Sequence, residues 1–474
     1  MSKNKESYKT IKRETLGDIE LYVNISRDGE VLKNDDGASD LSPYVLAFEI
    51  YESITSPGVE ASLIFNDANG LIGALTGTEP VTIRVSGSVL KRTYTFRTYS
   101  IVDRTRVNDN TDVYKINCTT DEFIKNEVVN VFGNTEVLFE DDLETSKIVE
   151  ELLSGDKYLG SEKKLFLEET STLQRFIAPN WRPFDTIYWM AQRSVRGNSG
   201  GGTASQNGFI FYENALGYHF KSIDGMINEI NQQTPDKTKV TNKGDTSVAK
   251  CKLYSYALSQ KGVDDGSADV FKISKVTFPE ERNYLEGLRQ GAWAGYSIAI
   301  DPVTLPSSQY GESQDMPAAA HRNNLFDTWS KMAHLGYNKN DVNPLTLTDE
   351  FVQQSVQVPK RARLNVLPNQ VFDQKGAGEK DQNYEKLAEL AAYQWMRFQS
   401  LKQIQLVIQV PGNLDLYAGA GVDVMIPATA KSKTPKIDKK YSGRYMIVGV
   451  THNGTTSKME TSLYLVKDAM RSGK

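Results

Sequence analysis

Hydrophobic and polar residues alternate along much of the first 118 residues. Ile19, Leu21, Val23 and Ile25 are separated by polar or smaller residues, which is the period of a strand with one buried face. Further strands are predicted at residues 44–54, 59–65, 81–85, 93–103 and 113–118. Short strands at such close spacing are typical of a small antiparallel barrel or sandwich.

The hydrophobic period becomes that of helices after Thr119. Helices are predicted at residues 121–131 and 145–153, and a stronger one at 183–195. One face of this stronger helix collects Phe184, Ile187, Tyr188, Ala191 and Val195. Pro183 suits the first turn, where its missing N–H would have no partner within the helix. The pattern therefore predicts an α/β region after the first β module.

The central part of the chain has fewer regular signals. A hairpin is predicted from residues 209–212 and 218–221, and strands at 270–276 and 296–300. Residues 197–208 and 303–322 are rich in small and polar residues and are predicted to be loops. Residues 336–383 are polar and are predicted to be mostly irregular.

A second strong helix is predicted at residues 384–400. Its apolar stripe consists of Leu387, Leu390, Ala391, Trp395 and Phe398. In the following strand, 403–410, Ile404, Leu406, Ile408 and Val410 face one way, and Gln403, Gln405 and Gln409 face the other. We expect the aliphatic face to fill a barrel core and the glutamine face to be wet and uncharged. That wet face either lines a channel or meets bulk solvent.

A short pattern occurs near both ends of the chain. Tyr99, Ile101, Val102 and Thr105 recur as Tyr445, Ile447, Val448 and Thr451 at identical spacing. Each copy follows a strand, 81–83 or 422–424, and precedes another, 113–118 or 461–466. Two similar β modules around a different middle are therefore predicted.

The predicted domains follow from this repeat. Residues 1–118 form the first β module, 119–260 an α/β middle domain, and 261–400 a region of mixed strands, long loops and a connecting helix. Residues 401–474 form the main part of the second β module. The predicted fold class is α+β, mainly β.

Composition and charge exclude several classes of protein. The net charge of −5 over 474 residues provides no basic field to collect nucleic acid or an anionic membrane. No segment approaches the ~20 apolar residues that span a bilayer, and the polar N-terminus is unlike a secretory signal. Cys118 and Cys251 are expected to be free thiols in a reducing compartment. We expect the chain to be made and folded in a cytoplasm.

Residue patterns for catalysis and for metal binding are missing from the sequence. His219, His321, His334 and His452 lack the spacing of metal ligands, and no CxxC, HExxH or GxSxG motif occurs. The triple glycine at 200–202 lacks the frame of a phosphate loop. We therefore predict no catalytic, cofactor-binding or metal-binding residues, no cofactor and no enzyme activity.

Acidic and aromatic residues could nevertheless suggest sugar chemistry. Glu168 and Glu169 could be a glycosidase acid, although a solvated acidic pair after a strand is favoured. Asp141 and Asp142 are expected in an exposed turn. Trp181 and the aromatic residues of 209–212 could stack on a base or sugar, but core positions are favoured.

Several segments together resemble one family. They are residues 179–185, which read PNWRPFD, residues 283–285 with Gly291 and Asp301-Pro302, residues 411–413, Gly419, the 445–451 pattern with His452, and residues 463–465. In this order they are similar to the central baseplate hub of contractile-tailed phages. That family is related to the hub part of VgrG spikes in type VI secretion and to phage late-control proteins.

The resemblance implies an architecture and a set of partners. Hub proteins carry two tail-tube-like antiparallel β-barrels with an inserted α/β region and form homotrimers. Six similar modules then match the sixfold tail tube or its initiator proteins. The other end of the trimer seats a central spike, and other baseplate proteins surround it. Such a protein is located in the virion, in the tail baseplate, after assembly in the bacterial host cytoplasm. No membrane anchor is implied.

Further consequences of the resemblance concern the spike, the cargo and the alternatives. Only residues 467–474 follow Val466, so the spike is expected to be a separate chain. DNA or a tape-measure protein would be passing cargo. The first alternative is a tail-associated cell-wall hydrolase, which a peptidoglycan zymogram would reveal. The second is the hub of a type VI secretion or pyocin-like injection particle, which genome neighbours would distinguish.

Overall fold

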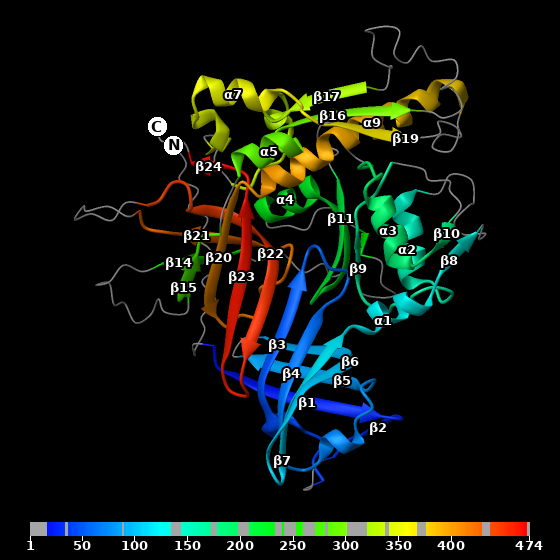
Figure 1. Cartoon of the computed structure of the whole chain (residues 1–474), viewed down its shortest axis with the longest axis vertical. Helices are drawn as coiled ribbons and strands as arrows, with labels where there is room; N and C mark the ends of the chain where they lie inside the picture. Colours follow the sequence, from blue (N-terminus) through cyan, green and yellow to red (C-terminus); the bar gives the residue numbers. More distant parts are fainter. Residues whose placement is uncertain are drawn as a thin grey trace.

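Both ends of the chain contribute to one large β-sheet (Figure 1). The computed structural model describes residues 17–33, 37–87, 90–133, 144–171, 178–197, 208–232, 239–240, 253–258, 271–279, 283–300, 320–336, 341–366, 376–428 and 437–471. Within these residues the largest sheet has 13 strands, in two groups that meet edge to edge. Two inserted regions lie beside and above this sheet in Figure 1.

The first group of strands is the N-terminal module. Its strands are β1 (Ile19–Arg27), β3 (Val45–Ser53), β4 (Glu60–Asp67), β5 (Pro80–Gly87), β6 (Lys91–Asn108) and β7 (Thr111–Thr119). They pair antiparallel in the order β3-β4-β7-β6-β5-β1, and β2 (Glu30–Val31) extends β1. Short 3-10 turns, η1 (Ser42–Tyr44) and η2 (Leu71–Ala74), connect them. The alternating apolar residues, such as Val23, Ile83 and Phe96, fill one core.

The second group is the C-terminal module. Its strands are β14 (Tyr254–Ala257), β15 (Lys275–Thr277), β20 (Ile404–Pro411), β21 (Gly421–Met425), β22 (Gly443–Gly454) and β23 (Met459–Lys467). They pair in the order β15-β20-β23-β22-β21-β14. The predicted aliphatic face of β20 is fully buried in this core, as expected. β14 and β15 come from residues far upstream of 401–474.

The two modules correspond strand by strand. In chain order β1, β3, β4, β5, β6 and β7 correspond to β14, β15, β20, β21, β22 and β23, and the order of pairing is the same. The pairing of β14 with β21 is parallel, whereas β1 and β5 are antiparallel. The predicted repeat of two β modules is therefore present, and the mainly β fold class is confirmed.

The register of this repeat differs from the predicted one. Phe96 pairs with Val81 and Tyr445 pairs with Val422, and both rings are buried at these equivalent positions. Tyr99 instead lies at a β-bulge and is 53% exposed. The predicted match of Tyr99 to Tyr445 is wrong, because Tyr, Ile, Val and Thr are common in any strand and their spacing does not define a register.

The middle domain follows β7. Its elements are α1 (Asp121–Val128), β8 (Val131–Gly133), α2 (Thr145–Ser154), β9 (Leu165–Leu167), β10 (Ala178–Trp181), α3 (Pro183–Ala191), β11 (Phe209–Asn214), β12 (Gly217–Ser222), α4 (Ile223–Gln232) and β13 (Lys239–Val240). β11 and β12 form the predicted hairpin, and α2 and α3 pack on it. Phe184 contacts the rings of Phe211 and Tyr218. α3 ends at Ala191, earlier than predicted.

A second region is inserted in the C-terminal module between β15 and β20. It comprises α5 (Tyr284–Gln290), β16 (Ala294–Ile300), β17 (Ala320–Asn324), α6 (Leu325–Thr328), η6 (Trp329–Lys331), β18 (Asp341–Val342), η7 (Pro344–Leu347), α7 (Glu350–Gln357), β19 (Ala362–Val366) and α9 (Gly376–Leu401). β18 pairs with β24 (Met470–Arg471). The prediction that 336–383 is mostly irregular is wrong, since α7, β19 and the start of α9 lie there.

Helix α9 buries a different face from the one predicted. Of the predicted stripe, Leu390 is buried, but Ala391, Trp395 and Phe398 are only half-buried. The fully buried face instead contains Met396 and a charged residue, Arg397. The face shifts because α9 packs on β16 and β17 on one side and on the C-terminal module on the other.

Some predictions fall outside the described residues. They concern Cys251, Asp141, Asp142, the glycines at 200–202, nearly all of the loop at 197–208, and most of the loop at 303–322. Among the helices that are described, none combines the length and the hydropathy that crossing a membrane requires.

Candidate assembly surface

One face of the large sheet crosses the junction between the modules as a continuous polar surface. β22 pairs antiparallel with β3, which places Thr451 beside Tyr51 and Asn453 beside Glu49. Ladder pairs extend these two rows of side chains in both directions. One row is Lys275, Gln409, Ser462, Thr451, Tyr51, Glu60, Thr119 and Arg97, and the other is Glu460, Asn453, Glu49, Ser62, Asn117 and Ser100. We call these two rows the polar face.

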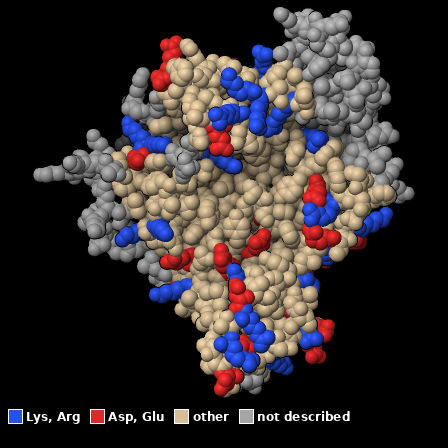
Figure 2. Space-filling view, in the orientation of Figure 1, with Lys and Arg blue, Asp and Glu red and all other residues tan. Residues whose placement is uncertain are grey.

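The charges in the middle of the polar face are negative. Glu49, Glu60 and Glu460 are exposed, and the cations of the two rows, Lys275 and Arg97, lie at the opposite ends of one row. Arg97 forms an ion pair with Asp121. Figure 2 shows acidic side chains across the middle of this side of the molecule. The amide of Gln409 donates to the carboxylate of Glu460, so even the glutamine is oriented along the surface.

The expectation that the three glutamines of 403–410 lie on a wet face is correct for two of them. Gln405 and Gln409 are half-buried, whereas Gln403 is buried. Gln403 precedes β20 and lies in the turn that leaves α9, where its N–H bonds the carbonyl of Ser400. The strand period therefore did not apply to it, and the expectation of a wet Gln403 is wrong.

Each module has one long strand whose two parts pair with different neighbouring strands. The first part of β22 pairs with β21, and its second part pairs with β23 and also with β3 of the other module. The equivalent strand β6 pairs with β5 in its first part and with β7 in its second. Among the described residues no strand occupies the other edge of this second part. We call residues 98–108 the free segment of β6.

A matching free edge is found at the other end of the sheet. β15 is equivalent to β3, and it pairs only with β20 among the strands that the structure describes. The free segment of β6 exposes Tyr99, Val102 and Val107 by 53%, 38% and 63%. An unpaired edge with exposed apolar residues is a template for pairing with another chain.

The junction between the modules is reinforced by a buried carboxylate. Glu52 of β3 accepts hydrogen bonds from the N–H of Ala418 and of Ala215, each at 3.2 Å. Burial raises the pKa of Glu52 to about 7, although Arg92 and both N–H groups favour its ionised form. Glu52 therefore connects the N-terminal module, the C-terminal module and the β11–β12 turn.

Glu168, the candidate glycosidase acid, is not a solvated residue. Its carboxylate accepts from the N–H of Ser222 at 2.7 Å and from the hydroxyl of Ser222 at 3.0 Å, and it pairs with Arg196. The prediction of a solvated acidic pair is wrong for Glu168, because the chain folds the end of β9 under α4. The bonds anchor the start of α4, so a Gln substitution here would disturb the fold rather than test catalysis.

The other candidate residues lie in separate parts of the fold. His219 and His452 are buried in different cores, and His334 contacts Asp468. The aromatic residues of 209–212 are buried, as favoured, and Trp181 is half-buried beside Trp189. Cys118 is a buried free thiol, as expected. Within the described residues no group of acidic, histidine or cysteine side chains could hold a metal.

The buried His452 makes the C-terminal module sensitive to acid. Its Nδ1 lies 3.0 Å from the hydroxyl of Thr461. Burial, with a smaller effect of the positive charge of Arg92, lowers the pKa of His452 to about 3. Since an unfolded histidine titrates near 6.5, stability is complete above pH 6.5 and is lost as the pH falls towards 3.

We expect a His452→Gln variant to lose less stability in acid than the parent. Between pH 7 and pH 4.5 the parent should lose about 2–3 kcal/mol more, since one pKa unit corresponds to about 1.4 kcal/mol. Urea unfolding of both proteins at the two pH values measures this difference. Equal acid sensitivity of the two proteins would contradict it.

No protein-family model matches the sequence, and no curated protein sequence matches it significantly. A tail protein from Neisseria meningitidis aligns with a TM-score of 0.48 and 8% identity over 95% of this chain and 97% of its own. The 43 kDa tail protein of prophage MuSo2 from Shewanella oneidensis aligns with a TM-score of 0.48 and 10% identity over 95% and 99%.

A third similar structure is a chain of the Francisella PdpA–VgrG complex. It has a TM-score of 0.44 and 10% identity over 96% of this chain and 53% of that one, so this chain spans about half of it. Tail proteins and a VgrG complex are the classes that the sequence segments resemble. Identities this low do not transfer a function.

Proposed function

We propose that this chain is the structural hub of a contractile-tail baseplate. It forms a homotrimer that joins the sixfold tail tube to a threefold central spike and surrounds the channel. The proposal also places the chain in the virion tail and assigns it no enzymatic role. The observation that carries it is the six-strand module that occurs twice in the chain. The two copies are joined to each other through β22 and β3, and the two equivalent edges, the free segment of β6 and β15, are unpaired among the described residues.

The free edges support a closed ring. Within the chain, β22 of one module pairs with β3 of the next. The same pairing between chains would bring the free segment of β6 against β15 of a neighbouring copy. Three copies then repeat six equivalent joins, with modules about 60° apart, as closed cyclic symmetry requires. A threefold assembly can in this way meet a sixfold tube without mismatch.

The polar face supports a channel lining. In a closed ring the three copies of this face, one from each chain, would turn to the same side, because the sheet continues through each join. Between Lys275 and Arg97 at its ends, this face presents hydroxyl, amide and carboxylate groups and no cation to phosphates, so DNA or a tape-measure protein would slide without being held. A basic lining would do the opposite.

The oligomeric state tests the proposed function. We expect light scattering to give a mass near three times 53.0 kDa at assembly concentrations, or after the separate spike protein is added. A strict monomer or dimer under both conditions would refute the hub as proposed. Capsid and packaging genes beside this one would distinguish a phage from a type VI or pyocin-like particle.

The alternative of a cell-wall hydrolase finds no support in the candidate acid. The carboxylate of Glu168 is buried, and it is held by the N–H of Ser222 and by Arg196. Clearing of peptidoglycan in a zymogram by the purified chain would nevertheless contradict the non-enzymatic role.

A further inference from the structure

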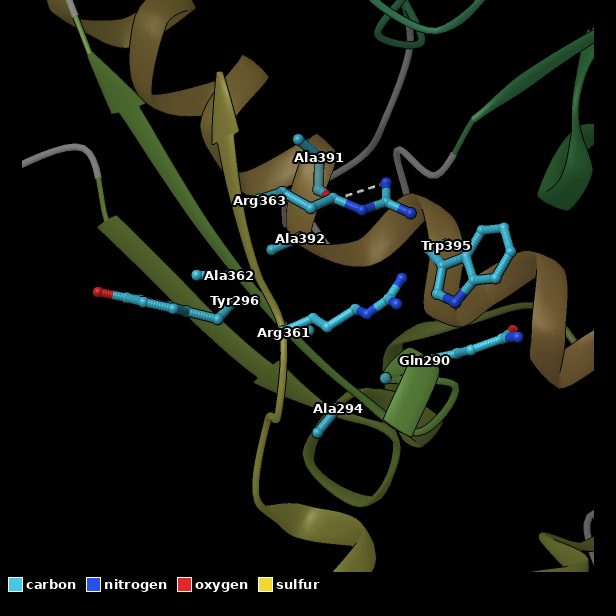
Figure 3. A pocket seen from close by; sticks show the side chains of 11 residues that line it. Gln290, Ala294, Tyr296, Arg361, Ala362, Arg363, Ala391, Ala392 and Trp395 are labelled. Atoms are coloured by element: carbon cyan, nitrogen blue, oxygen red, sulfur yellow. Dashed lines mark hydrogen bonds between the residues drawn. The ribbon is translucent and has the colours of Figure 1, made fainter. Parts of the chain in front are cut away.

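Arg361, the residue before β19, and Arg363, within β19, point in the same direction into a pocket of about 260 Å³ (Figure 3). The two arginines are two residues apart in an extended segment and therefore lie on one face of it. Both side chains extend towards α9, where Trp395 lies, and Gln290 of α5 lies below them. None of the residues lining this pocket is acidic.

The polar groups in this pocket are poorly satisfied by the chain itself. Arg363 donates to the carbonyl of Ala391 at a long 3.4 Å and lies over the Trp395 ring, 5.5 Å from its centre. The indole N–H of Trp395 is buried and has no hydrogen-bond partner. No ion pair of either arginine is present among the described residues. Two guanidinium groups and one indole N–H are all donors, and a carboxylate is the acceptor that suits them.

The pocket adjoins a larger, mostly apolar groove. Arg363 and Trp395 also line a groove of about 850 Å³ between α9, α3, β11 and the upper end of the polar face. Its walls include Tyr188, Phe398 and Tyr464, and again no acidic residue lines it. The part of the predicted α9 stripe that is only half-buried, Trp395 and Phe398, forms one wall.

We propose that this groove and pocket bind an extended segment of a partner protein that combines apolar side chains with a carboxylate. The carboxylate is received by Arg361, Arg363 and the indole N–H of Trp395, and the apolar side chains lie in the groove. The proposal deepens the hub function by specifying the chemistry of a baseplate partner.

The charges around the groove favour a peptide over a nucleic acid as its ligand. Aromatic walls could stack on bases, but the groove continues onto the polar face, where Glu49, Glu60 and Glu460 would repel a chain of phosphates. A peptide needs only one anionic group at the arginine end. Figure 2 shows lysine and arginine side chains over the upper part of the molecule, where β19 and α7 lie in Figure 1.

Binding of a defined probe tests this proposal. The probe is a fluorescent peptide that alternates leucine with aspartate, and its anisotropy is measured with the purified full chain. We expect saturable binding, weakened about tenfold or more by Arg361→Gln and by Arg363→Gln, since each removes charge-assisted hydrogen bonds. Lys360→Gln is the matched control, because it removes one positive charge from an exposed neighbour that does not line the pocket, and it should bind like the parent.

Several outcomes would overturn the proposal. A counterpart peptide with asparagine in place of aspartate should bind at least about tenfold more weakly, and equal binding would exclude a carboxylate site. Displacement of the probe by oligo-dT but not by unlabelled peptide would assign the groove to nucleic acid. Binding to the monomer but not to the trimer would assign it to a neighbouring copy. No binding of the acidic peptide would also overturn it. The mass measurement that tests the hub is independent of each result.

Discussion

Placing lysines on the free segment of β6 should abolish the trimer while leaving the subunit folded. In the double variant Tyr99→Lys/Val102→Lys, both changed side chains are already solvent-exposed in the subunit, so its fold should survive. In the proposed ring the same side chains would lie at the join with β15. Lysine on an edge strand is a device by which proteins prevent edge pairing.

The expected effect on assembly is large because the two lysines are present at each of the three joins between subunits. A loss of about 1–2 kcal/mol at one join is typical when cross-strand apolar contacts are replaced by charges. Three such joins weaken the trimer by about 3–6 kcal/mol, or about 10²- to 10⁴-fold. Light scattering and circular dichroism should therefore show a folded chain with the mass of a monomer.

The control changes two exposed apolar residues elsewhere. Val128 is 76% exposed at the end of α1, and Phe351 is 74% exposed on α7. A Val128→Lys/Phe351→Lys variant adds the same charge away from the free edges and should still form trimers. If the β6 double variant kept the mass of the trimer, the edge-to-edge join would be wrong even if the trimer itself is real.

Removing Arg397 should be the most destabilising single change in the second inserted region. Arg397 is fully buried, and it donates to Asp468 at 2.9 Å and to Asp224 at 3.0 Å. These contacts join α9 to α4 and to the residue after β23. Burial alone would raise the pKa of Asp468, but its interactions with His334 and Arg397 lower it to about 2.

We expect Arg397→Met to cost about 3–5 kcal/mol, because it leaves two buried carboxylates without this cation. The variant should aggregate or unfold at clearly lower urea concentration, and limited proteolysis should cut within α9. A variant that also carries Asp224→Asn and Asp468→Asn removes the unpaired charges and should recover part of the loss. If Arg397→Met unfolded within about 1 kcal/mol of the parent, the network would not hold these regions together.

Local patterns were sufficient for most strands and helices. Burial determines the alternation in β1 and β20 and the helical face of α3. A stretch of a few residues is therefore enough to predict these patterns. The same holds for the existence of two β modules, since the strands near 81 and 422 are each followed by similar partners. The sequence did not predict which residues of the two modules are equivalent. Bulges at Tyr99 and Val448 determine this register, and any residue can occupy a bulge.

Glu168, Gln403 and Arg397 show what a window of sequence leaves open. Each is a polar or charged residue that a local pattern assigns to solvent, yet each is buried because distant segments fold over it. For Glu168 and Arg397 these segments also supply hydrogen bonds, Ser222 to the first and Asp224 and Asp468 to the second. A buried charge is acceptable only with such partners, and they come from positions tens or hundreds of residues away.

The sequence by itself determined the mainly β class, the pair of modules and the resemblance to baseplate hubs. Tertiary structure alone decided how the modules join, which edges stay free, and that the apolar stripe of α9 borders a groove with Arg363. The physical reason is the distance along the chain over which the interactions act. Periodicity records whether a residue is buried, whereas strand order, strand edges and clefts depend on which distant segments meet, and a local pattern carries no record of that.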